Sequence, residues 1–456
     1  MTSLKKYALA AVLGLLAAVA LAVPWYSSRT LDAELKAYAD GARQGDLVVH
    51  KLSHQAGLFT SSGSIEFQLR DSCAADSAQT PSSFSVEYVV SHLPSPKGIF
   101  QFEWSVLPQG NTAANIEKVI GPGKKLSGTG ALGYGGLLKA DMDVPELNFS
   151  HEGVAFQVTP SKGSLHADKT AAQFVWNLQR FVARGNGDAL EMKSLSLNMD
   201  LKDRALGTGT IVLDIAGVST ASVSMEGLQV RSETIESKDR LDSKVSESVR
   251  VLNVMGQSLK DLALEASVTG LHAPSMRTLL EIGKATCGFG NMTADESQKV
   301  RKAVETMLTS GMSIGIPTLK GSGEGGQVSA NMVLELLPSS DGTIALEKHL
   351  RSSGALSITG TLLNQGQTEM ALATGFASKV PDGLKASYSY QDGLLKISDK
   401  TLDGGMVKTA LAQADRMIYG FLHPEKKPAA SAPQELIEEA DMPAAAAPAP
   451  AAAPAQ

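Results

Sequence analysis

The stretch MKSLSLNMDL, residues 192–201, decides the fold class of this 456-residue chain. Apolar and polar side chains alternate along it, with Leu195, Leu197, Met199 and Leu201 on one side and Ser194, Ser196, Asn198 and Asp200 on the other. A period of two places the two sets on opposite faces of a β-strand. The stretch therefore predicts a half-buried strand in an antiparallel sheet that has one solvated face.

The same alternation recurs along most of the chain. It is clear at residues 328–336 and 354–362, and weaker at 64–70, 84–90, 99–107, 137–149, 154–159, 208–215 and 219–231. Asp392-Gly393 stands between two strand-like runs, which is a strong short-range signal of a β-hairpin. The sequence lacks the continuous Val/Ile runs, alternating with helices, that a doubly wound parallel sheet requires.

A smaller part of the chain has helical periodicity. Apolar residues recur every three or four positions at 168–184, 241–262, 275–286, 294–309 and 405–422. Thr293 and Glu296 have the spacing of a capping box before the fourth segment. Because these helices are clustered and do not follow every strand, we expect an α+β, β-dominated fold with long antiparallel sheets and helices packed on one face.

The N-terminal segment predicts a membrane anchor. Lys5 and Lys6 precede residues 7–26, which carry no charge and would span about 30 Å as a helix, the thickness of a bilayer core. Basic residues before the span orient the N-terminus towards the cytoplasm. Residues 20–22, Ala-Leu-Ala, also fit the cleavage site of a signal peptide, so retention and cleavage both stay open.

These features give an expected organisation for the whole chain. Residues 1–6 would be cytoplasmic, 7–26 a transmembrane helix acting as a signal anchor, and 27–427 a β-rich region in the periplasm. That region would be one body or two subdomains divided near 235–270. Residues 428–456 are rich in Ala and Pro and predict a disordered tail. We therefore expect a single-pass inner-membrane protein.

Composition and charge exclude several classes of function. With 41 basic and 47 acidic side chains the net charge is −6, so no basic excess is present to neutralise the phosphates of a nucleic acid. The two cysteines, Cys73 and Cys287, are too few for a disulfide-dense scaffold or a four-thiolate metal site. In an oxidising periplasm they would form one disulfide or remain two thiols, and the sequence leaves both open.

Two short motifs lack the context that their chemistry requires. Residues 128–133 match G-x-G-x-x-G, but the preceding residues do not resemble a strand and the following ones do not resemble a helix. We expect a hairpin loop there and no dinucleotide site. His151-Glu152 begins like the zinc motif H-E-x-x-H, but Ala155 stands where its second histidine belongs, so we expect no metal site.

Other polar residues are best explained as the wet sides of strands. His50 and His54 are four residues apart in a stretch that looks extended, which would place them about 13 Å apart and in solvent. Asp141 and Asp143 alternate with apolar neighbours and mark the solvated face of another strand. We therefore predict no catalytic, cofactor-binding or metal-binding residue and no cofactor.

Several features together resemble the YdgA-like family of bacterial proteins of unknown function. They are the span ending in Trp25-Tyr26, the amphipathic segment with Leu31, Leu35 and Tyr38, the stretch HQAGLFTSSG at 54–63 and the hairpin at 390–395. The resemblance covers residues 1–422, while the Ala/Pro tail and Gln55-Ala56 depart from the family pattern. It implies a membrane-tethered, β-rich envelope protein and carries over no catalytic residue.

The expected function is binding without catalysis. We predict a non-enzymatic envelope protein whose partners are the inner membrane and an envelope protein or a second copy of itself, with no nucleic acid. An alternative is a lipid-binding groove, because long sheets whose apolar faces are partly covered could hold acyl chains. A less favoured alternative is an envelope hydrolase that uses His50 and His54 with Ser61 or Ser62.

Overall fold

A computed structural model of the chain describes residues 22–40, 47–69, 83–108, 124–151, 153–185, 187–286, 288–339 and 342–424. Within these residues, strands dominate and join into one 22-stranded sheet. The first strands are β1 (Leu47–Gln55), β2 (Thr60–Leu69), β3 (Ser83–Ser91), β4 (Phe100–Pro108), β5 (Leu126–Leu132), β6 (Leu138–Val144), β7 (Leu147–His151), β8 (Val154–Val158), β9 (Ser161–Ala167) and β10 (Ala172–Gly185). The strands that follow are β11 (Asp188–Asp203), β12 (Thr208–Ser219), β13 (Val223–Ser237), β14 (Arg240–Val254), β15 (Gln257–His272), β16 (Met312–Gly323), β17 (Gly326–Leu336), β18 (Leu350–Gly360), β19 (Ser378–Val380), β20 (Gly383–Gln391), β21 (Leu394–Ile397) and β22 (Lys400–Asp403).

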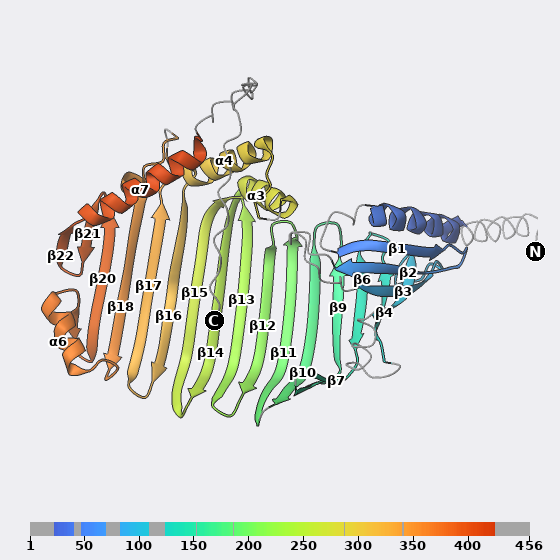
Figure 1. The fold of residues 1–456 in the computed structure, drawn as a ribbon, viewed down its shortest axis with the longest axis horizontal. Helices are drawn as coiled ribbons and strands as arrows, with labels where there is room; N and C mark the ends of the chain where they lie inside the picture. Colours follow the sequence, from blue (N-terminus) through green and yellow to red (C-terminus); the bar gives the residue numbers. More distant parts are fainter. Residues whose placement is uncertain are drawn as a thin grey trace, which may run out of the picture.

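Nearly every strand pairs with its neighbour in the sequence, so the sheet is a long antiparallel meander. Pairing runs from β1 to β6, passes to β9 and β10, and continues through consecutive strands to β18 and then β20 to β22. The small β7–β8 hairpin pairs with the second half of β10. Figure 1 shows β10 to β20 standing side by side. Such pairing needs only short turns, which accounts for the frequent turn residues of the sequence.

The strand and the hairpin that the sequence indicated most clearly are confirmed. Residues 192–201 lie in β11, where Leu197 pairs with Leu213 and Met199 with Ile211 on one face. Asp392 and Gly393 join β20 to β21 with φ values of 51° and 76°, as a type I′ turn requires.

The helix predicted over 241–262 is wrong. These residues form the β14–β15 hairpin, which turns at Met255-Gly256 with φ values of 49° and 84°. Residues four apart, such as Val245 and Val249, share one face of a helix and also one face of a strand, so their spacing does not distinguish the two. The helix predicted over 168–184 is wrong as well, because β10 occupies this stretch and its aromatic and β-branched residues favour a strand.

The other helices predicted from periodicity are confirmed. They are α3 (Ala273–Ala285), α4 (Ala294–Thr309) and α7 (Gly405–Leu422), to which the structure adds the short helices α5 (Leu346–His349) and α6 (Gln365–Thr374). The capping box before α4 is present: Thr293 Oγ1 accepts from the Glu296 N–H, and the Glu296 carboxylate accepts from the Thr293 N–H at 2.7 Å.

The helices are not laid across one face of the sheet, which corrects the expected packing. Figure 1 shows α3, α4 and α7 along one end of the long strands, and the middle of the strands carries no helix in that view. α3 is tied there by Arg277, which pairs with Asp203 at 2.7 Å and with Glu236 at 2.9 Å. Strands β10 to β15 follow one another through short turns, so no helix of the described chain is inserted between them.

The transmembrane helix predicted over 7–26, and the inner-membrane location that depended on it, are contradicted. Among the described residues, no helix is long and apolar enough to cross a bilayer. Residues 7–21 lie outside the described part of the chain, and residues 22–26 belong to a helix over 22–40 that carries charged residues such as Arg29 and Asp32. This helix lies beside β1 at the N-terminal end of the sheet, with Pro24 buried (Figure 1). The uncharged run thus continues into an amphipathic helix.

The remaining expectations about organisation are not decided by the fold. Residues 235–270, where two subdomains were expected to divide, lie in β13, β14 and β15 in the middle of the sheet, and the division stays a prediction. The segment 1–6, the Ala/Pro-rich segment 428–456 and both cysteines, Cys73 and Cys287, lie outside the described residues.

Candidate functional site

One face of the sheet is largely apolar from end to end, and we call it the apolar face. Cross-strand pairing places a continuous row of residues on it: His54, Gly63, Tyr88, Trp104, Gly128, Met142, Gly163, Trp176, Leu197, Leu213, Val230, Glu247, Leu264, Leu319, Ala330, Leu356 and Ala386. An adjacent row contains Leu195, Ile215, Leu228, Val249 and Leu262. Because directly paired residues share a face, the apolar face is continuous across the strands.

The part of the apolar face formed by β1 to β10 is built from aromatic residues and glycines, and we call it the aromatic half. Four cross-strand pairs define it: Gly63–Tyr88, Gly128–Trp104, Gly130–Phe102 and Gly163–Trp176. A Cβ on Gly128 would collide with the carbonyl oxygen of Asp141 and lie 2.7 Å from the Trp104 ring. Glycine at such positions lets the ring of the neighbouring strand lie flat on the sheet.

The part formed by β11 to β18 carries mainly leucine, isoleucine, valine and methionine, and we call it the aliphatic half. Several of its side chains are exposed, whereas the residues of β2 and β3 at the N-terminal end of the sheet include buried ones. Leu264, Leu319 and Met332 are 36%, 43% and 43% exposed, whereas Phe67 and Val90, near helix 22–40, are 7% and 4% exposed. Large contiguous apolar patches are uncommon on soluble monomers and mark binding sites.

The aromatic half is joined to helix 22–40 by a buried polar cluster that we call the histidine clasp, made of Ser27, Ser61 and His92. His92 follows β3 and is fully buried, with its Nδ1 3.1 Å from Ser27 Oγ and its Nε2 2.7 Å from Ser61 Oγ. A Ser–His pair at this distance is also the geometry of an activated nucleophile. Here, however, Ser61 is 0% exposed, and a serine holds the Nδ1 side where a carboxylate would orient a catalytic histidine.

His54 is half-buried on the same face of the sheet as the clasp, opposite Gly63 in β2. Its Nδ1 is 2.9 Å from the Tyr88 hydroxyl, and the two rings stack with centroids 6.0 Å apart. Burial lowers the pKa of His54 below its ordinary value, although Asp32 of helix 22–40 acts in the opposite direction. Burial also raises the pKa of Tyr88 to about 12, and the negative charge of Asp32 adds to this effect.

The structure does not bring together the residues of the predicted hydrolase. His50 is exposed, as expected, and a bulge at this residue in β1 separates it from the face that carries His54. Ser61 lies on the apolar face and contacts His92, whereas Ser62 points to the opposite face. The expectation that His54 is solvated is wrong, because helix 22–40 lies beside it. His92 was not predicted as a site residue, because in the sequence it is only a single histidine after an apolar run.

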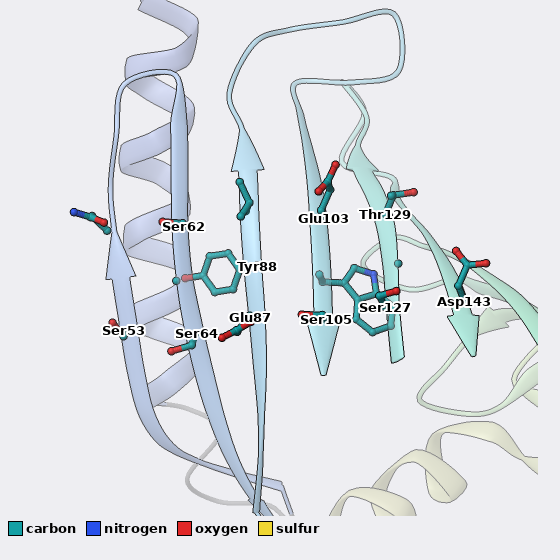
Figure 2. A pocket seen from close by; sticks show the side chains of 15 residues that line it. Ser53, Ser62, Ser64, Glu87, Tyr88, Glu103, Ser105, Ser127, Thr129 and Asp143 are labelled. Carbon is teal, nitrogen blue, oxygen red and sulfur yellow. The ribbon is translucent and has the colours of Figure 1, made fainter. Parts of the chain in front are cut away.

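The opposite face of β1 to β6 is polar and hollowed. A cavity of about 800 Å³ lies on it. Figure 2 shows Ser62, Glu87, Glu103, Thr129 and Asp143 around this cavity, each from a different strand. Lys125 lies 3.7 Å from Glu87, and Lys162 lies 3.3 Å from Asp143, so two of its carboxylates are neutralised. The cavity offers hydrogen bonds to a polar molecule, and within the described chain no group of His, Cys, Asp and Glu could hold a metal ion.

The other motifs of the sequence lie in strands. Residues 128–132 lie in β5 between β4 and β6, so the expected hairpin loop is a strand, and β6 follows where a dinucleotide site needs a helix. Asp141 and Asp143 are exposed on β6, as predicted. His151 ends β7, and Glu152 lies outside the described residues.

Comparison with known proteins places the chain in a family. Residues 4–363 match the family described as bacterial protein of unknown function (DUF945). The chain belongs to this family. No curated protein and no solved structure matches it. Membership covers the sheet from β1 to β18 and brings no assigned site residue. It does not confirm the YdgA-like name, and the membrane tether that the resemblance implied has no candidate span among the described helices.

Proposed function

We propose that this protein binds the acyl chains of lipids on the aliphatic half of its apolar face, without a chemical step. The observation that carries the proposal is the exposure of that half. Leu264, Leu319 and Met332 keep more than a third of their surface in contact with solvent, on strands that are otherwise regularly paired. Fully burying a leucine or methionine side chain contributes about 1.5–3 kcal/mol. A ligand that covers the exposed part of each of these side chains gains the corresponding fraction, and the gain adds up over the residues that it covers.

The chemistry of the aliphatic half favours acyl chains over a protein partner. Protein–protein contacts draw much of their energy from Trp, Tyr and Arg. The rows of the aliphatic half contain instead leucine, isoleucine and valine, with Met199 and Met332 as adaptable side chains. Glu247 is the charged residue of the central row, and it is exposed.

The size of the aliphatic half also suits acyl chains. From β11 to β18 the face measures about 34 Å at the usual spacing of strands. The 15 residues of β14 extend for about 50 Å along the strand. One leaflet of a bilayer is about 15 Å of hydrocarbon, so several acyl chains could lie on this surface.

The proposal is tested by mass spectrometry of the lipids that co-purify with the full-length chain under mild conditions. Met332→Lys places a charge on the apolar face, and Asn331→Lys places the same charge on the adjacent, exposed position of β17 that faces the other way. We expect bound lipid in the wild type and in Asn331→Lys, and at least a tenfold loss in Met332→Lys, since one buried unpaired charge costs several kcal/mol.

Two results would contradict the proposal. One is a wild-type protein that carries no lipid and acquires none from mixed micelles. The other is a stable dimer, seen by light scattering, that Met332→Lys dissociates while Asn331→Lys does not. The second result would assign the same face to a second copy of the chain, which the sequence also predicts and which no observation tests.

A further inference from the structure

We propose that the histidine clasp is a pH-sensitive latch, in which protonation of His92 releases helix 22–40 from the aromatic half of the apolar face. The release itself follows from the contacts of the clasp. Its consequence for ligand binding rests on the proposed function, because only a ligand of the apolar face would gain surface when the helix moves.

Every polar atom of the clasp has a defined role when His92 is neutral. Ser27 Oγ donates to the carbonyl oxygen of Pro24 at 3.1 Å, so it accepts from the Nδ1–H of His92. Ser61 Oγ accepts from the N–H of Gly57 at 3.2 Å, so it donates to Nε2 of His92. The ring thus uses one donor and one acceptor, which is the full capacity of a neutral imidazole.

A second ring proton breaks this arrangement. Nε2 would then carry a proton and donate to Ser61 Oγ, so the hydroxyl proton of Ser61 would lose its acceptor. A full positive charge would also lie on a side chain with 0% exposure, which costs free energy. Burial, and the neighbouring charge of His54, hold the pKa of His92 below its ordinary value of 6.5. Once the helix has moved away and the ring is hydrated, the pKa returns towards that value.

The charged groups around the clasp do not compensate for the added proton. His54 of β1 acts on His92 and opposes its charge. Asp32 of helix 22–40 acts on His54 and is itself paired with Lys36 at 2.8 Å. Arg29, on the same helix, lies over the Trp25 ring at 5.0 Å, and the ring packed edge-on against His92 is the apolar Phe100.

The direction of the pH effect follows from linkage. Well above pH 6.5 His92 is neutral whether the helix is attached or released, so the contribution of the clasp to attachment is fully present there. As the pH falls below 6.5, the released state takes up a proton and the attached state does not, so acid favours release. Each unit by which the attached pKa lies below the released one changes the equilibrium about tenfold.

The effect of release on the fold is local. Helix 22–40 is a separate element that ends before β1, and the long strands from β10 onward do not depend on it for pairing. Its departure would expose the buried Val90, the cross-strand partner of Ser61 in the clasp. The aliphatic half would then continue without a cover into the aromatic half.

The test is hydrogen exchange of the full-length chain without lipid, at about pH 7 and about pH 5, with rates corrected for the intrinsic effect of pH. We expect peptides within 22–40 to lose protection about tenfold for each pH unit below the released pKa, and peptides of α4 to stay unchanged. His92→Gln cannot titrate and should remove the pH dependence. His50→Gln, on the exposed histidine of β1, should retain it.

A titration of the histidine side chains of the wild type by NMR gives a second readout if His92→Gln does not fold. A pKa of His92 at or above 6.5 overturns the latch. Unchanged corrected exchange of residues 22–40 at the lower pH also overturns it. Neither measurement contains lipid, so the latch can fail while the lipid proposal stands, and the reverse.

Discussion

Single glycines decide how the aromatic residues lie on the sheet. Gly128 and Gly63 stand opposite Trp104 and Tyr88, and each ring occupies the space that a Cβ would need. The sequence predicted a hairpin loop for the glycines at 128–133. Their physical role is the opposite of a loop, because they allow close packing within a regular strand.

Gly128→Ala is expected to destabilise the protein by about 1–3 kcal/mol, because overpacking forces the Trp104 ring or the β6 backbone to shift. Urea unfolding followed by circular dichroism measures the change. Gly135→Ala is the control, since a Cβ there meets open space. Equal stability of the two variants would show that the ring does not depend on Gly128.

Ser61→Ala is expected to cost about 1–3 kcal/mol, because it leaves the N–H of Gly57 and Nε2 of His92 buried without their partner. Ser62→Ala removes the same atom one residue further on, from the opposite face, and should change stability by less than about 0.5 kcal/mol. Thermal unfolding of both variants tests the pair. A neutral Ser61→Ala would contradict the assigned hydrogen bonds of the clasp.

Only part of the candidate site could be predicted from the sequence. The alternation of apolar residues in β11 and β17 indicated one apolar face of the sheet. Ser61 and His92 are 31 residues apart, and Ser27 and His92 are 65 apart. Such contacts depend on how a helix docks on a sheet, which no local pattern reports.

At the scale of elements, local signals predicted the helix ends well. The capping box of Thr293 and Glu296 starts α4 as expected. Thr293→Ala should therefore destabilise the protein by about 1 kcal/mol, measured by urea unfolding. Ser297→Ala, inside the same helix, should have a smaller effect. A loss of the same size in both variants would mean that helix propensity, and not the cap, accounts for it.

Elements were predicted wrongly where one spacing fits two structures. Val245 and Val249 lie on one face of β14 and would also lie on one face of a helix. The turn at Met255-Gly256 was the signal that could have decided for a hairpin, because both residues adopt positive φ there. β-Branched residues along β14 pointed the same way.

In the whole molecule the sheet is a single layer, and the described helices lie beside only part of its apolar face. Helix 22–40 lies beside the aromatic half, and α3, α4 and α7 line one end of the long strands (Figure 1). A single sheet normally needs a second layer to bury its apolar face. The sequence predicted the apolar face, but it could not show that helices 275–286, 294–309 and 405–422 would lie at the end of the strands.

The most direct test of the account is photo-crosslinking of the full-length protein with a phospholipid that carries a photoactivatable group in its acyl chain. Mass spectrometry then locates the labelled residues. We predict adducts on the apolar face of β14 to β18, at residues such as Leu264, Leu319 and Met332. Adducts confined to polar-face positions such as Asn331, or none at all, would contradict it.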